Sequence, residues 1–141
     1  MKKIIKRSDC PVSYAMDLFG DKWSLLIIRD IVFYDKQFFK EFRSSKEKIA
    51  SNILSDRIKK LESAGILVSE IYEKQRSQKV YSLTQKGIDL VPILVEIMIW
   101  SAKYDNELAI TPEFQEAMEH DREGLISRIK AKLIAGEPRT E

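Results

Sequence analysis

Cysteine and histidine, which often act as nucleophiles, bases and metal ligands, each occur once in this chain of 141 residues, as Cys10 and His120. One cysteine cannot form an intrachain disulfide. One cysteine and one histidine cannot build a Cys-rich zinc centre or a two-histidine metal site. A Ser-His-Asp or Cys-His mechanism would have to run through His120 alone, and the chain has no glycine-rich phosphate loop. We therefore expect no enzyme activity, no bound metal and no cofactor.

Cys10 is the residue whose setting favours a reactive thiol. It precedes Pro11, and because proline is well tolerated at the first position of a helix, Cys10 is predicted to be an N-cap. The positive end of the helix dipole, with Lys6 and Arg7 nearby, favours the thiolate, whereas Asp9 opposes it. Two interpretations stay open. Cys10 is either a redox sensor that forms intersubunit bridges, mixed disulfides or alkyl adducts, or a small residue packed at a dimer seam.

The basic residues are concentrated in the middle of the chain, although the formal net charge is only +2. Residues 36–79 carry eleven Lys and Arg against six Asp and Glu, a local charge of +5. Residues 105–141 carry five against nine, a local charge of −4. Phosphate binding requires such a concentration of positive charge, and a solvated lysine-rich surface is the alternative interpretation.

Apolar spacing predicts the helices that position these charges. Short helices are expected near residues 11–19, 21–31 and 38–42. From Ser51 onward, Leu54, Ile58 and Leu61 recur at i, i+4 and i+7, and Gly65 ends the run. This spacing predicts an amphipathic helix over about residues 51–64, with small and hydrogen-bonding side chains on its outer face.

A two-stranded hairpin and further helices are predicted for the rest of the chain. Residues 66–72 and 79–83 read as strands joined by a polar connection, 73–78. Thr84 is expected to cap a long helix that Pro92 bends or breaks. Helix starts are expected at Thr111 and Asp121, and the tail from residue 136 is expected to fray. This order of elements is that of a winged helix-turn-helix, with 51–64 as recognition helix and the hairpin as wing.

Several sequence motifs, in the same order along the chain, resemble HxlR-type transcriptional regulators. They are Cys10-Pro11-Val12, residues 20–29 (GDKWSLLIIR), 54–62 (LSDRIKKLE), 65–67 (GIL), 80–87 (VYSLTQKG) and Trp100. The resemblance covers about residues 9–101 and implies a homodimeric winged-helix DNA-binding protein, a repressor or an activator, whose dimer is built from N- and C-terminal helices. Some regulators of this type sense electrophiles or oxidants through the cysteine of the Cys-Pro motif, so Cys10 is a candidate redox sensor.

The expected fold is therefore mainly α with a small antiparallel β-hairpin, a winged helix-turn-helix with long C-terminal dimerisation helices. Residues 1–104 are expected to form the DNA-binding domain with its dimerisation helices, and residues 105–141 a helical extension of the same domain. The recognition helix would enter the major groove, and the wing, residues 73–79, would contact the minor groove or the backbone.

The candidate DNA contacts lie on the predicted recognition helix, on the segment before it and on the wing. Asn and Ser can pair with base edges, and Lys with guanine or phosphate. Asp56 is expected to pair with Lys60 at i+4 rather than to contact a base, and Arg57 to hold a phosphate or a neighbouring acid. The full set is Arg43, Lys46, Lys48, Ser51, Asn52, Ser55, Arg57, Lys59, Lys74, Arg76 and Lys79.

The expected partners are double-stranded DNA, a second copy of the chain and a small-molecule or electrophile effector. A winged-helix protein-interaction module without DNA binding is the alternative function. The longest apolar runs, residues 25–28 and 97–100, are far shorter than the roughly 20 residues that cross a bilayer. With no targeting segment and one unpaired cysteine, a cytoplasmic protein without a membrane partner is expected.

Overall fold

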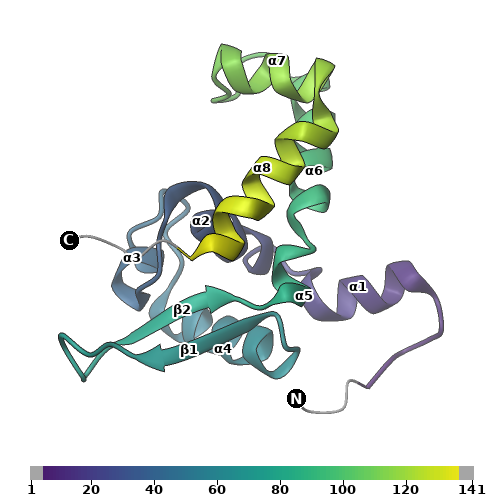
Figure 1. Ribbon diagram of the computed structural model, residues 1–141. Coiled ribbons are helices and arrows are strands. Elements are labelled where there is room, and N and C mark those ends of the chain that lie inside the picture. The colour runs from purple at the N-terminus through teal and green to yellow at the C-terminus, as the bar shows by residue number, and fades with distance from the viewer. Residues whose placement is uncertain (1–4, 137–141) are drawn as a thin grey trace. The chain divides into compact units, whose positions relative to one another are not determined.

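The computed structural model describes residues 5–136, and these residues form eight helices and one two-stranded hairpin (Figure 1). The predicted mainly helical fold with a small antiparallel hairpin is confirmed. The tail predicted to fray starts at residue 136, and its residues 137–141 lie outside the described residues. No helix within residues 5–136 is long and apolar enough to cross a membrane. The elements are α1 (Pro11–Phe19), α2 (Ser24–Tyr34), α3 (Phe39–Arg43), α4 (Ser51–Ser63), β1 (Leu67–Ile71), β2 (Lys79–Leu83), α5 (Gln85–Ile88), α6 (Val91–Tyr104), α7 (Pro112–His120) and α8 (Arg122–Ala135).

The chain divides into two compact units. The first ends at Gly87 and contains the helices α1 to α4 and the hairpin. The second begins at Ile88 and contains α6, which contacts α7 and α8. The predicted break near Pro92 is confirmed, because α5 ends at Ile88 and α6 starts at Val91 with the proline in its first turn.

Helix α4 closes the core of the first unit. Its residues Leu54, Ile58 and Leu61 are fully or almost fully buried, as their i, i+4, i+7 spacing predicts. The helix contacts α1, α2 and α3. Because one face is used in this packing, the opposite face is left to solvent, and the predicted amphipathic helix is confirmed.

The hairpin is attached to the core at its base. Its strands pair in antiparallel register from Leu67 with Leu83 to Ile71 with Lys79. The ring of Tyr81 is buried, and the Tyr81 backbone N–H donates to the carbonyl oxygen of Gln37 at 2.8 Å. The strand β2 is therefore hydrogen-bonded to the segment between α2 and α3, and the loop at the far end of the hairpin extends away from the core (Figure 1).

The C-terminal end of α4 is held by the segment that follows the hairpin. Gly65 adopts a left-handed conformation with φ of 75°, which ends the helix. The backbone N–H of Thr84 donates to the carbonyl oxygen of Ile66 at 3.0 Å, and Lys86 Nζ donates to the carbonyl oxygen at the C-cap of α4 at 2.9 Å. At Gly87 a Cβ atom would lie 2.5 Å from the Ile66 carbonyl oxygen, so no larger residue fits.

Two capping side chains start the last two helices, as predicted. The Thr111 hydroxyl accepts from the backbone N–H of Phe114 at 3.2 Å, and the Asp121 carboxylate accepts from that of Gly124 at 3.2 Å. Together with α6, the capped helices α7 and α8 make up the helices of the second unit over its described residues after α5. The buried residues of these three helices are Val91, Leu94, Val95, Met118, Leu125 and Ile126.

Candidate nucleic-acid interface

The outer face of α4 carries polar side chains that have no partner in the protein. Ser51, Asn52 and Lys59 are exposed and Ser55 is half-buried. None of the four side chains has a hydrogen-bond or ion-pair partner among residues 5–136. Because their donors and acceptors are already solvated, they can exchange water for another polar surface at little cost.

Arg57 is engaged inside the protein. Its Nη1 donates to Asp56 Oδ2 at 2.7 Å, and its Nε lies 3.2 Å from Asp21 Oδ1. Lys60 Nζ lies 3.4 Å from the same Asp56 oxygen, so the predicted Asp56–Lys60 pair is confirmed. Of the two roles considered for Arg57, the structure contains the pairing with neighbouring acids. The guanidinium group thus joins the middle of α4 to the segment before α2.

Asp21 also organises the N-terminus of α2. Its Oδ1 accepts from the backbone N–H groups of Trp23 and Ser24 at 2.8 and 2.9 Å, and its Oδ2 accepts from the Ser24 hydroxyl. Burial raises the pKa of Asp21, but these hydrogen bonds and the charge of Arg57 outweigh burial and lower its pKa below the ordinary value. The ionised carboxylate therefore holds α2 and α4 together through Arg57.

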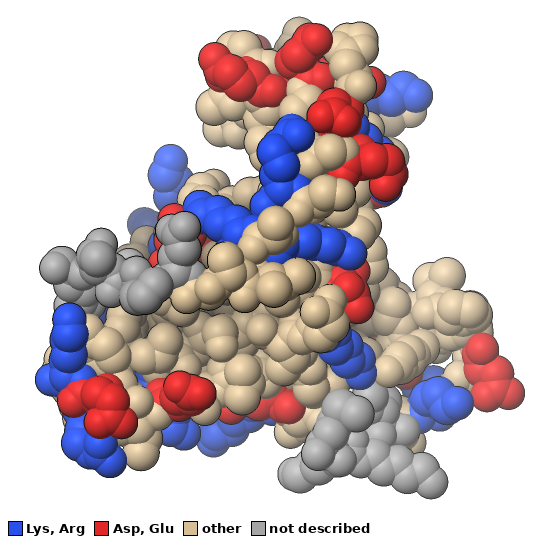
Figure 2. All heavy atoms as spheres, viewed as in Figure 1, with Lys and Arg blue, Asp and Glu red and all other residues tan. Residues whose placement is uncertain are grey.

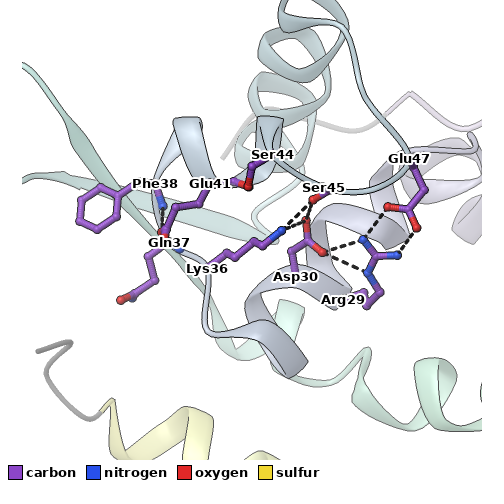
Figure 3. Close-up of polar contacts among 9 residues, drawn as sticks. All are labelled: Arg29, Asp30, Lys36, Gln37, Phe38, Glu41, Ser44, Ser45 and Glu47. Atoms are coloured by element: carbon purple, nitrogen blue, oxygen red, sulfur yellow. Dashed lines mark hydrogen bonds and ion pairs between the residues drawn. The ribbon is translucent and has the colours of Figure 1, made fainter. Parts of the chain in front are cut away.

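A second polar cluster holds the turn between α3 and α4 (Figure 3). Its centre is Asp30, a carboxylate that is only 2% exposed. Arg29 donates to Asp30 Oδ1 through Nη2 at 2.7 Å and through Nε at 3.0 Å. The Ser45 hydroxyl donates to Asp30 Oδ2, and Lys36 Nζ donates to Ser45 Oγ at 3.0 Å. Since Ser45 belongs to the turn and Asp30 to α2, this cluster fixes where the turn leaves α3.

Arg29 reaches the same turn a second time through Glu47. Two parallel hydrogen bonds, at 2.7 and 2.9 Å, join the guanidinium group to the two carboxylate oxygens. This bidentate contact is the main reason that the pKa of Glu47 falls to about 2, and it raises the pKa of Arg29 above its ordinary value. The turn is therefore tied to α2 at both Ser45 and Glu47.

Three cations lie on or beside the turn that these contacts hold. Arg43, Lys46 and Lys48 are exposed and have no ion-pair partner among residues 5–136. Lys48 has φ of 58°, a left-handed conformation that costs a non-glycine residue about 1 kcal/mol. All three residues were predicted as contacts from the sequence, and the structure leaves their charges available.

Of the three cations on the wing, Arg76 is paired with an acid, and Lys74 and Lys79 have no ion-pair partner among the described residues. The backbone N–H of Tyr72 donates to the carbonyl oxygen of Gln78 at 2.9 Å and so closes the loop at the end of the hairpin. Arg76 Nη1 donates to Glu73 at 2.9 Å in an exposed i, i+3 pair, which is worth less than about 1 kcal/mol. Lys74 and Lys79 are exposed and have no ion-pair partner among the described residues.

The contacts predicted from the sequence did not include Lys40 on α3, which is exposed and likewise has no partner within residues 5–136.

The unit that ends at Gly87 has eighteen Lys and Arg against eleven Asp and Glu, a formal charge of +7. The unit that begins at Ile88 has six against eleven, a charge of −5. Figure 2 shows Lys and Arg beside acidic side chains at the tip of the hairpin, and mainly Asp and Glu over α7. The nearly neutral chain therefore consists of one basic and one acidic unit.

Cys10 lies at the N-cap of α1, as predicted from the proline that follows it. The thiol is free and exposed. The backbone carbonyl oxygen of Cys10 accepts from the Tyr14 backbone N–H at 3.0 Å, which is the first hydrogen bond of the helix. His120, at the end of α7, is an exposed surface residue whose Nε2 lies 3.7 and 3.8 Å from carboxylate oxygens of two glutamates.

Glu47→Gln is expected to lower the free energy of unfolding by about 1 kcal/mol at pH 7, a value reduced for the 39% exposure of the side chain. Because the folded pKa of about 2 lies below the ordinary 4.5, the stabilisation is complete above pH 4.5 and declines as the pH falls toward 2. Urea unfolding of both proteins between pH 7 and pH 3 measures this difference. Glu70→Gln, at an exposed residue without an ion-pair partner among residues 5–136, is the control. A difference that stays constant with pH would contradict the assignment.

Comparisons with known proteins indicate the same class of fold. The family model for the HxlR-like helix-turn-helix matches residues 18–109, about two thirds of the chain. The uncharacterized HTH-type transcriptional regulator YdeP of Bacillus subtilis is 30% identical over 99 residues, which are 70% of this chain and 77% of YdeP. The solved structure of PA1607, a candidate transcription factor, has a TM-score of 0.66 at 36% identity and covers 74% of this chain and 73% of its own.

A third relative is the redox regulator HypR in its oxidized form. Its structure has a TM-score of 0.59 at 32% identity and covers 70% of this chain and all of HypR. The fold order and the family match over most of the chain support the same assignment, and the relatives are transcriptional regulators, not enzymes. The chain is a transcriptional regulator of the winged-helix type and belongs to the HxlR-like helix-turn-helix family.

Proposed function

We propose that the protein is a sequence-specific DNA-binding regulator that acts as a homodimer, with α4 in the major groove and the β1–β2 wing on the minor groove or the backbone. The observation that carries this proposal is the outer face of α4, where Ser51, Asn52 and Lys59 are exposed and unpartnered on the unit with a charge of +7. A helix with this composition, packed through its other face, presents base-reading and phosphate-binding groups together.

The two kinds of contact fall on different elements. Asn52 can make two hydrogen bonds to an adenine edge, and Ser55 and Lys59 can contact neighbouring base edges or phosphates. Phosphates can be bound without breaking an ion pair of the protein by the exposed cations Arg43, Lys46, Lys48, Lys74 and Lys79.

Two arginines from the predicted set have different roles. Arg57 positions α4 through Asp21 and Asp56 and is not needed as a direct contact. Arg76 can exchange its exposed Glu73 partner for a phosphate, since that pair contributes little to stability. The proposed interface thus uses all the predicted cations except Arg57 for direct contact.

A protein-interaction module without DNA binding is the alternative. It does not require unpartnered cations on α4 and the wing, so charge reversal of Lys59 and Arg76 should leave its function intact. The accumulation of free lysines on these elements favours the DNA-binding function.

Selection of bound fragments from a genomic DNA pool should yield a two-half-site operator, and the affinity of the protein for it should fall steeply with salt.

Lys74→Gln is expected to weaken binding to all sequences alike and to reduce the slope of log K against log salt by about 1. Asn52→Ala is expected to cost about 1–3 kcal/mol and to relax sequence preference at one position per half-site.

Electrophoretic mobility shifts over a range of salt concentrations measure both effects. Lys103→Gln removes one exposed charge from the acidic unit and is the matched control, with unchanged binding expected. Failure to enrich any fragment, or operator binding that does not change with salt, would reject the proposal.

The homodimer is supported by an apolar stripe on α6. Ile93, Ile97, Trp100 and Tyr104 follow at i, i+4, i+7 and i+11 and are exposed by 39%, 42%, 67% and 70%. The first three of them line a hollow of about 690 Å³ on this unit. An exposed apolar stripe at helical period is typical of a protein interface, and the resemblance of the chain to homodimeric regulators makes a second copy the expected occupant.

Trp100→Glu is expected to convert a dimer of twice the 16.4 kDa chain mass into a monomer at micromolar concentration, because it places a charge in the stripe. Sedimentation velocity measures the mass. Ser127→Glu places the same residue at an exposed position of α8 in the same unit, outside the stripe, and should leave the dimer intact. A wild-type monomer, or dissociation by both substitutions, would contradict this assignment.

We also propose that Cys10 makes operator binding responsive to thiol oxidants. The support is its exposed thiol at the start of α1 and the similarity of the chain to HypR, which is a redox regulator. With one cysteine per chain, a disulfide must join two subunits or join Cys10 to a small thiol.

Diamide is expected to change operator affinity in the wild type and not in Cys10→Ser. In forming an intersubunit disulfide, two thiols give two electrons and two protons to diamide, and a non-reducing gel should show a covalent dimer that dithiothreitol removes. Mobility shifts with and without diamide provide the second readout. An equal response of both proteins would make Cys10 a structural residue.

A further inference from the structure

A hollow of about 520 Å³ lies within the first unit, between the start of α3, the second half of α4 and the end of the wing loop. Its apolar lining includes Phe38, Ile58 and Tyr81, all of them less than 10% exposed. This volume is in the range of sites for small organic molecules. Two of these three residues have aromatic rings, so the apolar part of the hollow suits a flat ring better than a flexible chain.

Three lysines from three different elements line the same hollow. They are Lys40 on α3, Lys59 on α4 and Lys79 on β2, and none has an ion-pair partner among residues 5–136. The one acid in the lining is Glu62, whose carboxylate accepts from the Ser69 hydroxyl at 3.0 Å. The charged lining therefore has a net charge of +2.

Tyr81, which lines the hollow, also offers an uncharged donor. The hydroxyl group of Tyr81 has no hydrogen-bond partner among the described residues, although the residue is only 8% exposed. Burial and, to a smaller extent, the charge of Glu62 raise the pKa of Tyr81 above its ordinary value. The phenol therefore stays protonated at neutral pH and can donate a hydrogen bond to an anion.

We propose that this hollow binds a small aromatic anion, with its ring on the apolar lining and its carboxylate or sulfonate among Lys40, Lys59 and Lys79. A neutral ring would leave the three lysines without a counter-charge, and an inorganic anion would leave the apolar lining in contact with water. The observed combination of an aromatic floor with converging free cations fits a ligand that carries both features.

Binding of such an anion would also oppose binding of DNA. The ligand would neutralise Lys59 and Lys79 and cover Ser55, which also lines the hollow. These are residues that we assign to DNA, so the two ligands would compete for them. This second step rests on the proposed function, whereas binding of the anion itself does not.

The direct test is titration of the ¹⁵N-labelled full chain with 2-naphthoate in the absence of DNA. The changes in the NMR chemical shifts of the backbone amides are the measurement. Shifts should be concentrated at residues 55–62 and 77–81. The neutral 2-naphthol and inorganic sulfate should each bind at least about tenfold more weakly than 2-naphthoate. Absent shifts, shifts confined to the apolar stripe of α6, or equal affinity for naphthol would overturn the proposal.

Lys40→Gln should weaken 2-naphthoate binding by about three- to tenfold, since it removes one of three converging charges. Lys46→Gln is the matched control, because Lys46 is also an exposed, unpartnered lysine of the same unit and does not line the hollow. Equal losses in both variants would indicate general charge attraction and would overturn the site. Amide spectra of both variants establish that each is folded.

Competition is measured as the factor by which 2-naphthoate raises the apparent Kd for the selected operator. This factor should be large for the wild type and several-fold smaller for Lys40→Gln at the same ligand concentration. Operator binding that is unchanged at saturating 2-naphthoate would overturn the competition step. Naphthoate binding without any operator binding would reject the proposed function and leave the ligand site standing.

Discussion

The buried carboxylate of Asp30 is the constraint on which the arrangement around α4 depends. A charge that is 2% exposed must be compensated, because its transfer out of water without partners would cost several kcal/mol. Arg29, Ser45 and Lys36 supply this compensation, and Ser45 comes from the turn that leads into α4 (Figure 3). Satisfying one buried group therefore fixes the path of the chain between α3 and α4, and with it the direction in which α4 presents its outer face.

Most arginines of the basic unit are paired with acids, whereas several of its lysines are exposed and have no partner among residues 5–136. Arg29, Arg57 and Arg76 each pair with an acid, and the planar guanidinium group of Arg29 holds both oxygens of Glu47. The lysines Lys59 and Lys74, by contrast, remain exposed and unpartnered among residues 5–136. A rigid fork suits a fixed internal contact, and a flexible stem with a point charge suits a partner that binds and leaves. Because the paired cations hold the unit together and the unpaired ones stay in solvent, one unit can be internally well connected and still carry free positive charge.

The secondary structure followed closely from local patterns. The spacing of Leu54, Ile58 and Leu61 predicted α4, and the alternation around Tyr81 predicted β2, because a buried face repeats with the period of its element. Pro92 and Gly65 predicted ends of helices for reasons of backbone geometry alone. The outer face of α4 could be predicted in the same way, since it is the complement of the buried one.

The contacts that select among the charged residues could not be predicted, because they join residues far apart in the chain. Nothing local indicates that Arg29 reaches Glu47 or that Arg57 reaches Asp21. The position of Lys40 beside the hollow was likewise not predictable, because only packing brings α3, α4 and β2 around one hollow.

The sequence by itself determined the order of the elements, the buried face of α4 and the excess of basic residues before the acidic C-terminal part, since periodicity and composition are local properties. Only the tertiary structure decided which of those basic residues are neutralised within the protein and which stay free, because an ion pair depends on distances in space that spacing along the chain does not contain.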